Sequence, residues 1–212
     1  QIWGYKENDT FGGKDIYSGS KGAAELVIKS YYHSFFKLIQ SNVRVSIARA
    51  GNVIGGGDWA KDRIIVDAML AWSSGKKVEI RSPKATRPWQ HVLEPLSGYL
   101  ILGQQLSEDA SLNGEGFNFG PRAEQDRTVG ELLVDLSKCW NIRYEDAVAV
   151  TDDIPFHEAG LLKLNCDKAR SYLGWQANLK YEDTIQFTSE WYYDYYNSDI
   201  NILNKTFDQI TA

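Results

Sequence analysis

The chain has 212 residues, of which 43% are hydrophobic and 24% charged, and its formal net charge at pH 7 is −5. The acidic balance argues against a nucleic-acid-binding protein, which would normally carry a basic face. The two cysteines lie far apart in the sequence, so neither a disulfide framework nor a metal site is expected, and a cytoplasmic location fits. No apolar run reaches the length of a membrane span, and the first residues lack the pattern of a leader peptide.

Apolar residues at helical spacing predict a first helix over residues 15–38, and alternation over 43–47 predicts a strand. A glycine-rich loop is expected over 51–58. Further helices are expected at about 62–74, 94–106, 129–140, 167–173 and 181–196, and short strands at 78–81, 117–119 and 144–150. Asp62 and Thr128 are the expected N-caps of the helices that follow them, and the tail after residue 197 is expected to fray. Alternating strands and helices predict an α/β protein with a mainly parallel sheet.

Tyr17 and Lys21 stand four residues apart in the first predicted helix, so they share one face. A nearby ammonium stabilises a phenolate, which can take a proton from a sugar hydroxyl as hydride leaves the same carbon. Many helices contain this spacing by chance, and an exposed tyrosine beside a solvated lysine is the alternative interpretation. The neighbouring sequence decides between them.

The neighbouring motifs resemble those of the extended short-chain dehydrogenase/reductase family. The Tyr-x-x-x-Lys motif is followed by a predicted strand and then by Arg-x-x-Asn-Val-x-Gly at residues 49–55. The strings GNVIGGGDWAKDR (51–63) and IRSPKATRPWQHVLEPLSGY (80–99) are similar to CDP-glucose 4,6-dehydratases in particular. The resemblance covers nearly the whole chain and weakens after about Trp191.

The resemblance implies a role for each residue that matches a family motif. Tyr17 would be the base at the sugar C4 hydroxyl, and Lys21 would hold the ribose of the cofactor, NAD. The stretch from Ala50 to Val53 would pass close to the nicotinamide. Contacts to the nucleotide-sugar would come from Asn52, Arg63, Val78, Ile80, Arg87, Asn118 and His157. Turn formation, surface salt bridges or packing at a sheet edge are the structural alternatives for these residues.

Among these contacts, Arg87 and Arg63 would hold the pyrophosphate, a role that suits a planar and permanently charged fork. His91 stands where related dehydratases more often have tyrosine, and we expect it to be structural. Around His157 the chain departs from the family pattern, because Gly160-Leu161 replaces an expected His-Tyr.

The resemblance further implies a Rossmann-type doubly wound parallel sheet with a smaller α/β substrate-binding lobe. Residues 1–53 and 88–120 would belong to the C-terminal half of the NAD-binding domain, and residues 54–87 and 121–212 to the nucleotide-sugar-binding lobe. The N-terminal half of the sheet, the glycine-rich phosphate loop and the acid/base pair for water elimination would lie upstream of Gln1. We therefore expect the chain to be a fragment that is inactive alone.

The implied activity is conversion of CDP-D-glucose to CDP-4-keto-6-deoxy-D-glucose and water, with the hydride recycled internally through NAD. Such products feed deoxysugar synthesis for bacterial surface polysaccharides, and the family implies a homodimer or larger assembly. Two alternatives remain open at this point. One is another nucleotide-sugar epimerase, decarboxylase or dehydratase, and the other is a truncated relative that binds nucleotide-sugar without turnover.

Overall fold

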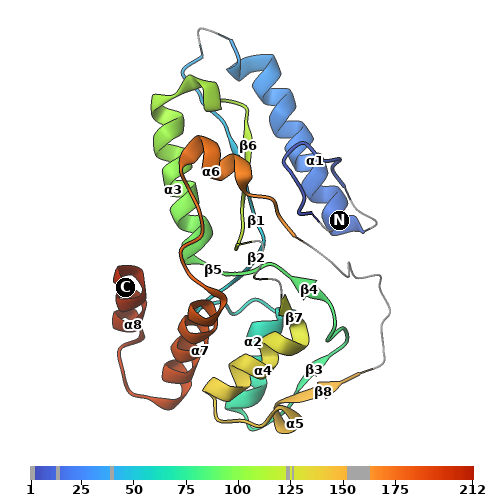
Figure 1. The fold of residues 1–212 in the computed structure, drawn as a ribbon, viewed down its shortest axis with the longest axis vertical. Coiled ribbons are helices and arrows are strands. Elements are labelled where there is room, and N and C mark those ends of the chain that lie inside the picture. The colour runs from blue at the N-terminus through green and yellow to red at the C-terminus, as the bar shows by residue number, and fades with distance from the viewer. Residues whose placement is uncertain (1–2, 13–14, 39–40, 123–124, 126, 152–162) are drawn as a thin grey trace.

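The computed structural model describes residues 3–12, 15–38, 41–122, 125, 127–151 and 163–212 (Figure 1). The helices are α1 (Ile16–Tyr31), α2 (Ile64–Ser73), α3 (Leu93–Glu108), α4 (Val129–Cys139), α5 (Tyr144–Ala147), α6 (Asp167–Leu173), α7 (Tyr181–Asn197) and α8 (Ile202–Thr211). The strands are β1 (Ile47–Ala50), β2 (Asn52–Ile54), β3 (Val78–Ile80), β4 (Thr86–Arg87), β5 (Trp89–His91), β6 (Gly116–Phe119), β7 (Arg127–Thr128) and β8 (Val148–Val150). A π-helical turn, Tyr32–Phe36, extends α1, and a 3-10 turn, Ala110–Leu112, follows α3.

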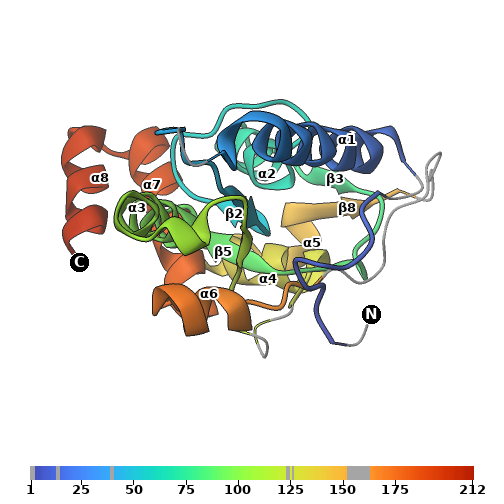
Figure 2. The same cartoon turned by 90° about the horizontal axis from the view of Figure 1, so that it is seen from above.

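The described strands associate in pairs. β1 pairs with β6, β2 with β5 and β3 with β8, all in parallel, whereas β4 and β7 pair antiparallel. Parallel neighbours need crossover connections, and here the helices supply them, which confirms the predicted α/β class. Figure 2 shows α1 and α6 on opposite sides of the strands.

Two apolar cores hold the fold together. The first lies around β6 and is closed by α3 and α6; its buried residues are Leu102, Leu112, Phe117, Phe119, Ala169, Leu173, Trp175 and Ala177. The second lies among α2, α4 and α7, next to β3, β5 and β8, and includes Met69, Trp72, Trp89, Leu133, Leu136 and Tyr192. Figure 1 shows these two groups of elements at opposite ends of the longest axis. The domain boundaries at residues 53, 87 and 120 stay a prediction.

Two helix ends follow the predicted local chemistry. At the start of α4, the Thr128 hydroxyl accepts a hydrogen bond from the Glu131 amide at 3.1 Å, and the Glu131 carboxylate accepts one from the Thr128 amide at 2.8 Å. This is a reciprocal capping box, and it confirms Thr128 as the N-cap. Gly174 ends α6 in the left-handed conformation, at φ 65°, which glycine adopts without steric hindrance.

Replacing Thr128 with alanine is expected to lower the free energy of unfolding by about 1 kcal/mol, because the hydroxyl both accepts from the Glu131 amide and donates to the Glu131 carboxylate at 2.7 Å. Urea denaturation monitored by circular dichroism would measure the change. Thr10→Ala, at an exposed position before α1, is the matched control. Equal losses in the two variants would contradict the assignment.

The predicted cap of α2 is wrong. Asp62 has φ 62°, so its backbone is left-handed, and Arg63 occupies the N-cap position without a side-chain capping bond. The strand predicted over 144–150 is also half wrong. Residues 144–147 form the short helix α5, and the preceding Arg143 donates to Asp146 from Nε at 3.0 Å and from Nη2 at 2.7 Å. Only the remaining residues form β8.

The tail is not frayed, because residues 202–211 form α8. Asn201 caps this helix by accepting a hydrogen bond from the Leu203 amide at 3.0 Å. Lys205 then pairs with Glu190 at 2.7 Å and with Asp194 at 3.2 Å, which ties α8 to α7. The polar composition of the tail concealed this periodicity.

Candidate active site

Asp15 is the N-cap residue of α1. The Asp15 carboxylate accepts hydrogen bonds from the Ser18 amide at 2.8 Å and the Ser18 hydroxyl at 2.7 Å. These bonds stabilise the charged form and lower the pKa of Asp15. Tyr17 follows in the first turn, and the Lys21 ammonium lies 5.5 Å from its ring centroid. The two side chains therefore share one face of α1, as their spacing predicts.

Tyr17 is 68% exposed, so in the described part of the chain its ring is largely uncovered. A phenol that acts on a bound substrate must be reachable from outside the protein core, and this position meets that requirement. The adjacent ammonium supplies the cation that a phenolate and a ribose hydroxyl would both use. The donor chemistry of this pair therefore fits the ribose end of a nicotinamide nucleotide.

Strand β1 ends beside this helix and leads directly to Asn52. Ala50 closes β1 opposite Phe119, and after Gly51 the chain continues into β2. A side chain at Gly51 would approach Pro88 to 2.9 Å, so glycine permits this close passage. Asn52 then pairs with Trp89, two residues after Arg87. The structure thus places Asn52 and Arg87 on neighbouring segments, with Val53 opposite Gln90.

Arg87 lies in β4 directly opposite Arg127 of β7. The guanidinium of Arg87 donates to the Thr86 carbonyl at 2.8 Å, and that of Arg127 lies 5.1 Å from the ring centroid of Tyr181. This register brings two arginines to neighbouring positions, and guanidinium groups are well suited to binding phosphate. Sequence reasoning missed Arg127, because a strand of two residues gives no readable periodicity.

Arg63 is exposed at the beginning of α2, at the end of the glycine-rich loop. That loop packs against α7: a side chain at Gly56 would lie 2.0 Å from Trp191, and the Tyr192 hydroxyl donates to the Asp58 carbonyl at 2.7 Å. Trp191 fills the space that an anion would need at Gly56. Glycine at position 56 therefore permits the close packing of this loop against α7.

Val78 and Ile80 point into the second core, and each is 3% exposed. Their side chains are therefore turned away from solvent, whereas Glu79 between them is exposed, and a ligand contact by Val78 or Ile80 would have to use backbone atoms. Beyond the ends of β3 and β8 lies an open pocket of about 490 Å³, lined by residues 81–85, Val150 and Thr151. Arg81 and Lys84 give its rim a positive charge. The predicted contact at His157 lies outside the described residues.

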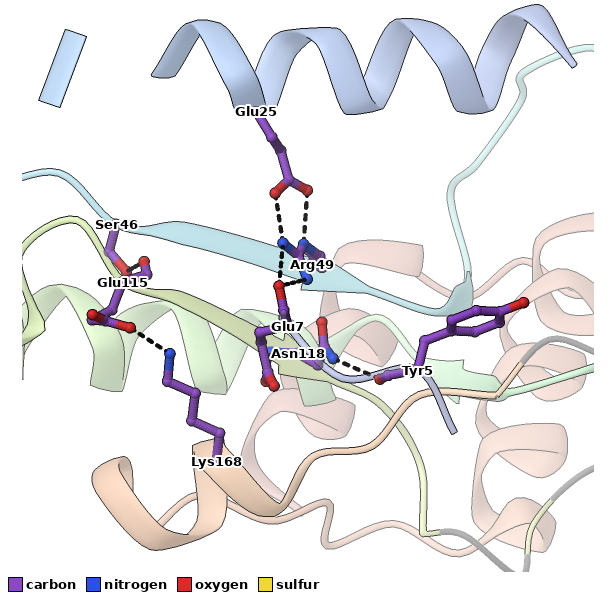
Figure 3. A network of polar contacts seen from close by, with 8 residues as sticks. All are labelled: Tyr5, Glu7, Glu25, Ser46, Arg49, Glu115, Asn118 and Lys168. Carbon is purple, nitrogen blue, oxygen red and sulfur yellow. Dashed lines mark hydrogen bonds and ion pairs between the residues drawn. The ribbon is translucent and has the colours of Figure 1, made fainter. Parts of the chain in front are cut away.

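Asn118 is buried, 1% exposed, and its side chain is engaged by the backbone. Its amide nitrogen donates to the Tyr5 carbonyl at 3.0 Å (Figure 3). The same nitrogen donates to the Asn165 carbonyl at 3.1 Å, and the main-chain amide donates to the Glu7 carboxylate at 2.9 Å. Asn118 thus holds the segment before α1 against β6. Only its Oδ1 has no partner among the described residues. Its contact with substrate stays a prediction.

His91 is 2% exposed and packs edge-on against Phe187, with 5.6 Å between ring centroids. Burial lowers the pKa of His91 to about 4, so the ring is neutral near pH 7. Its position inside the fold agrees with a structural role.

Neither a metal-binding cluster nor a membrane-spanning helix occurs in the ranges that the structure describes. Within those ranges, no group of three or more histidine, cysteine, aspartate or glutamate side chains is arranged to hold a metal ion. Nor does any helix there have the length and apolar character needed to cross a membrane.

Comparison with known proteins gives clear sequence relatives. The chain is 44% identical over 195 residues to CDP-glucose 4,6-dehydratase of Salmonella typhimurium, an alignment that covers 90% of this chain and 54% of that protein. It is 25% identical over 201 residues to dTDP-glucose 4,6-dehydratase of Haemophilus influenzae, covering 89% of this chain and 54% of that protein. The chain spans about half the length of these curated relatives. No protein-family model matches the chain.

Among solved structures, a dTDP-glucose 4,6-dehydratase from Bacillus anthracis, determined in complex with NAD, is similar with a TM-score of 0.76. The two are 19% identical, and the match covers 91% of this chain and 56% of that one. This likeness confirms the predicted Rossmann-like α/β fold. The resemblance that the motifs predicted is confirmed as well: over nine-tenths of its length, this chain is similar to part of a CDP-glucose 4,6-dehydratase.

Proposed function

We propose that the full-length protein containing this chain is a CDP-glucose 4,6-dehydratase, which forms CDP-4-keto-6-deoxy-D-glucose and water. The observation that carries this proposal is the 44% identity to the Salmonella typhimurium enzyme, against 25% to the dTDP-glucose enzyme. The exposed Tyr17–Lys21 pair, on a helix that lies beside the strands leading to Asn52 and Arg87, supports it.

In this proposal each residue acts through groups that the structure describes. The Tyr17 phenolate, stabilised by the Lys21 ammonium, takes the proton of the C4 hydroxyl and becomes a neutral phenol. Asn52 orients the sugar by hydrogen bonding, while Arg87 and Arg63 bind the pyrophosphate. NAD would be held by Tyr17, Lys21 and the backbone of 50–53, and when bound it supplies the site that accepts and returns the hydride.

We also propose that the intact protein forms a homodimer or larger assembly through α1. Apolar side chains on this helix are unusually uncovered: Leu26, Val27 and Tyr31 are each 55% exposed, and Phe35 in the following turn is 58% exposed. A stripe of this kind is normally covered by another chain or by further protein. Sedimentation of the full-length protein would test the assembly.

The substrate is tested by incubating the full-length protein and NAD with CDP-, dTDP- and GDP-glucose in parallel. Formation of a 4-keto product, followed by its absorbance in alkali, is expected with CDP-glucose. A preference for dTDP-glucose would contradict the assignment of the nucleotide. Recovery of a C4 epimer without loss of water would contradict the assignment of the reaction.

Replacing Arg87 with methionine is expected to raise KM for CDP-glucose about 10- to 100-fold while kcat changes little, because a phosphate contact is made equally in ground and transition states. Steady-state kinetics would measure both constants. Arg170→Met, which removes an exposed arginine on α6 that is paired with Asp167, is the matched control. An unchanged KM would exclude Arg87 from the phosphate site.

A further inference from the structure

Arg49 connects three separate segments of the chain at the strand beside the candidate site. Its Nε donates to Oε1 of Glu25 at 2.7 Å, and its Nη2 donates to Oε2 at 2.6 Å, so β1 and α1 are joined by a two-pronged ion pair (Figure 3). Both Nη atoms also donate to the Glu7 carbonyl at 3.2 Å. The two side chains of the ion pair are only 20% and 15% exposed. Such paired, partly buried geometry orients its partners more strongly than a surface ion pair.

Glu25 continues the stripe that contains Tyr17 and Lys21. Residues four apart are rotated by about 40° on a helix, so these three side chains occupy one face. Because Glu25 is held against β1, the rotation of α1 about its axis is held too. That rotation determines where Tyr17 and Lys21 point.

The ion pair also sets how far α1 extends along β1. Tyr17 is two turns before Glu25, about 12 Å along the helix, and Asn52 is three residues after Arg49, about 10 Å along an extended chain. Figure 1 shows α1 running opposite to β1, so both displacements have the same direction. Tyr17 and Asn52 therefore reach a similar level beyond the ion pair.

The segment that leads into α1 is held by the same arginine. The Phe11 ring lies 5.0 Å from the Arg49 guanidinium and 4.5 Å from the Lys29 ammonium. This segment crosses the helix at buried Gly22, next to Lys21, where an added side chain would approach Gly12 and Phe11 to 3.2 Å. Phe11 and Gly12 are thus held between α1 and β1.

We infer that Arg49 and Glu25 are a positioning pair, which sets the rotation and level of α1 so that Tyr17 and Lys21 face the sugar held at Asn52. This inference rests on the proposed function for its catalytic consequence. Its structural part, the restraint of α1 by the ion pair, can be measured independently.

The test uses Arg49→Met in the full-length protein. We expect kcat for the 4-keto product to fall about 10- to 100-fold, with KM for CDP-glucose within about threefold, because the base is misplaced while the phosphate contacts remain. The pH dependence of kcat should keep its shape, since Tyr17 and Lys21 are unchanged. Arg49→Lys keeps the charge without the fork, so its kcat should lie between those of the Met variant and the wild type.

Hydrogen exchange supplies the readout that does not depend on activity. In Arg49→Met the amides of α1 should lose protection about tenfold, while those of α4 keep theirs. Arg143→Met is the matched control, because Arg143 also donates twice to a carboxylate, in its case to Oδ2 of Asp146, but is 74% exposed. That variant should leave kcat and α1 protection unchanged.

Wild-type kcat together with wild-type α1 protection in Arg49→Met would overturn the inference. So would equal loss of protection in α1 and α4, which would make Arg49 a residue of general stability. If Arg49→Met does not fold, Glu25→Gln and Arg49→Lys are judged by the same criteria. A wild-type protein without dehydratase activity would refute the proposed function, and the exchange comparison would still decide whether the pair restrains α1.

Discussion

Replacing Tyr17 with phenylalanine is expected to lower kcat for the 4-keto product about 10³-fold, the usual contribution of a positioned acid/base group. The change removes one oxygen and keeps the ring next to the Lys21 ammonium. Because Tyr17 is 68% exposed, neither α1 nor an apolar core should be disturbed. The measurement is steady-state turnover of CDP-glucose by the full-length protein.

Tyr172→Phe is the control for this experiment, since Tyr172 is 63% exposed on α6, which lies on the opposite side of the strands from α1 (Figure 2). It should retain wild-type turnover. The KM of the Tyr17 variant should change little, because the phosphate contacts hold the substrate. A Tyr17→Phe protein that retained more than about a tenth of the wild-type kcat would show that another group takes the proton.

Acid should destabilise the protein through His91 in particular. The pKa of this buried ring is about 4, whereas an unfolded histidine titrates near 6.5. Above pH 6.5 the ring is neutral in both states and costs nothing. As the pH falls from 6.5 to 4, the unfolded state binds a proton that the folded state does not, so the free energy of unfolding decreases. The loss amounts to about 3 kcal/mol at the lower end.

Urea titrations of the wild type and of His91→Leu between pH 7.5 and 4 would measure this effect. The difference in stability between the two proteins should change by about 3 kcal/mol across that range, in favour of the variant at low pH. Comparing slopes removes any constant cost of the substitution. Thr188→Val changes a buried residue next to Phe187 without removing a titrating group, so it should keep the wild-type slope. Parallel curves for the wild type and His91→Leu would contradict the role of His91.

Features governed by neighbouring residues could be predicted from the sequence. The capping box of Thr128 and Glu131 and the left-handed Gly174 are each complete within a few positions, and the structure agrees with both. The Tyr-x-x-x-Lys spacing likewise predicted that Tyr17 and Lys21 share one face of a helix, and the structure agrees. In such cases the residues that form the interaction are close together in the sequence, so the sequence pattern reveals it.

Features that depend on contacts between distant segments could not be predicted. No sequence pattern distinguishes Glu25 from other acidic residues in a helix. Its importance depends on the ion pair with Arg49 of β1, which only the structure shows. Helix α8 owes part of its order to ion pairs from Lys205 to α7, which a polar tail does not reveal. Asp62 has a capping side chain, yet the path of the loop sets its backbone in a conformation that cannot start a helix.

The contact between Gly56 and Trp191 has a consequence for engineering. The loop can pass α7 only because position 56 has no side chain, and the indole occupies the freed volume. If the loop around Gly56 were transferred to another protein without α7, the space that Trp191 fills would become a cavity. Recombination between relatives should therefore succeed when both segments come from one parent and fail when they come from different ones.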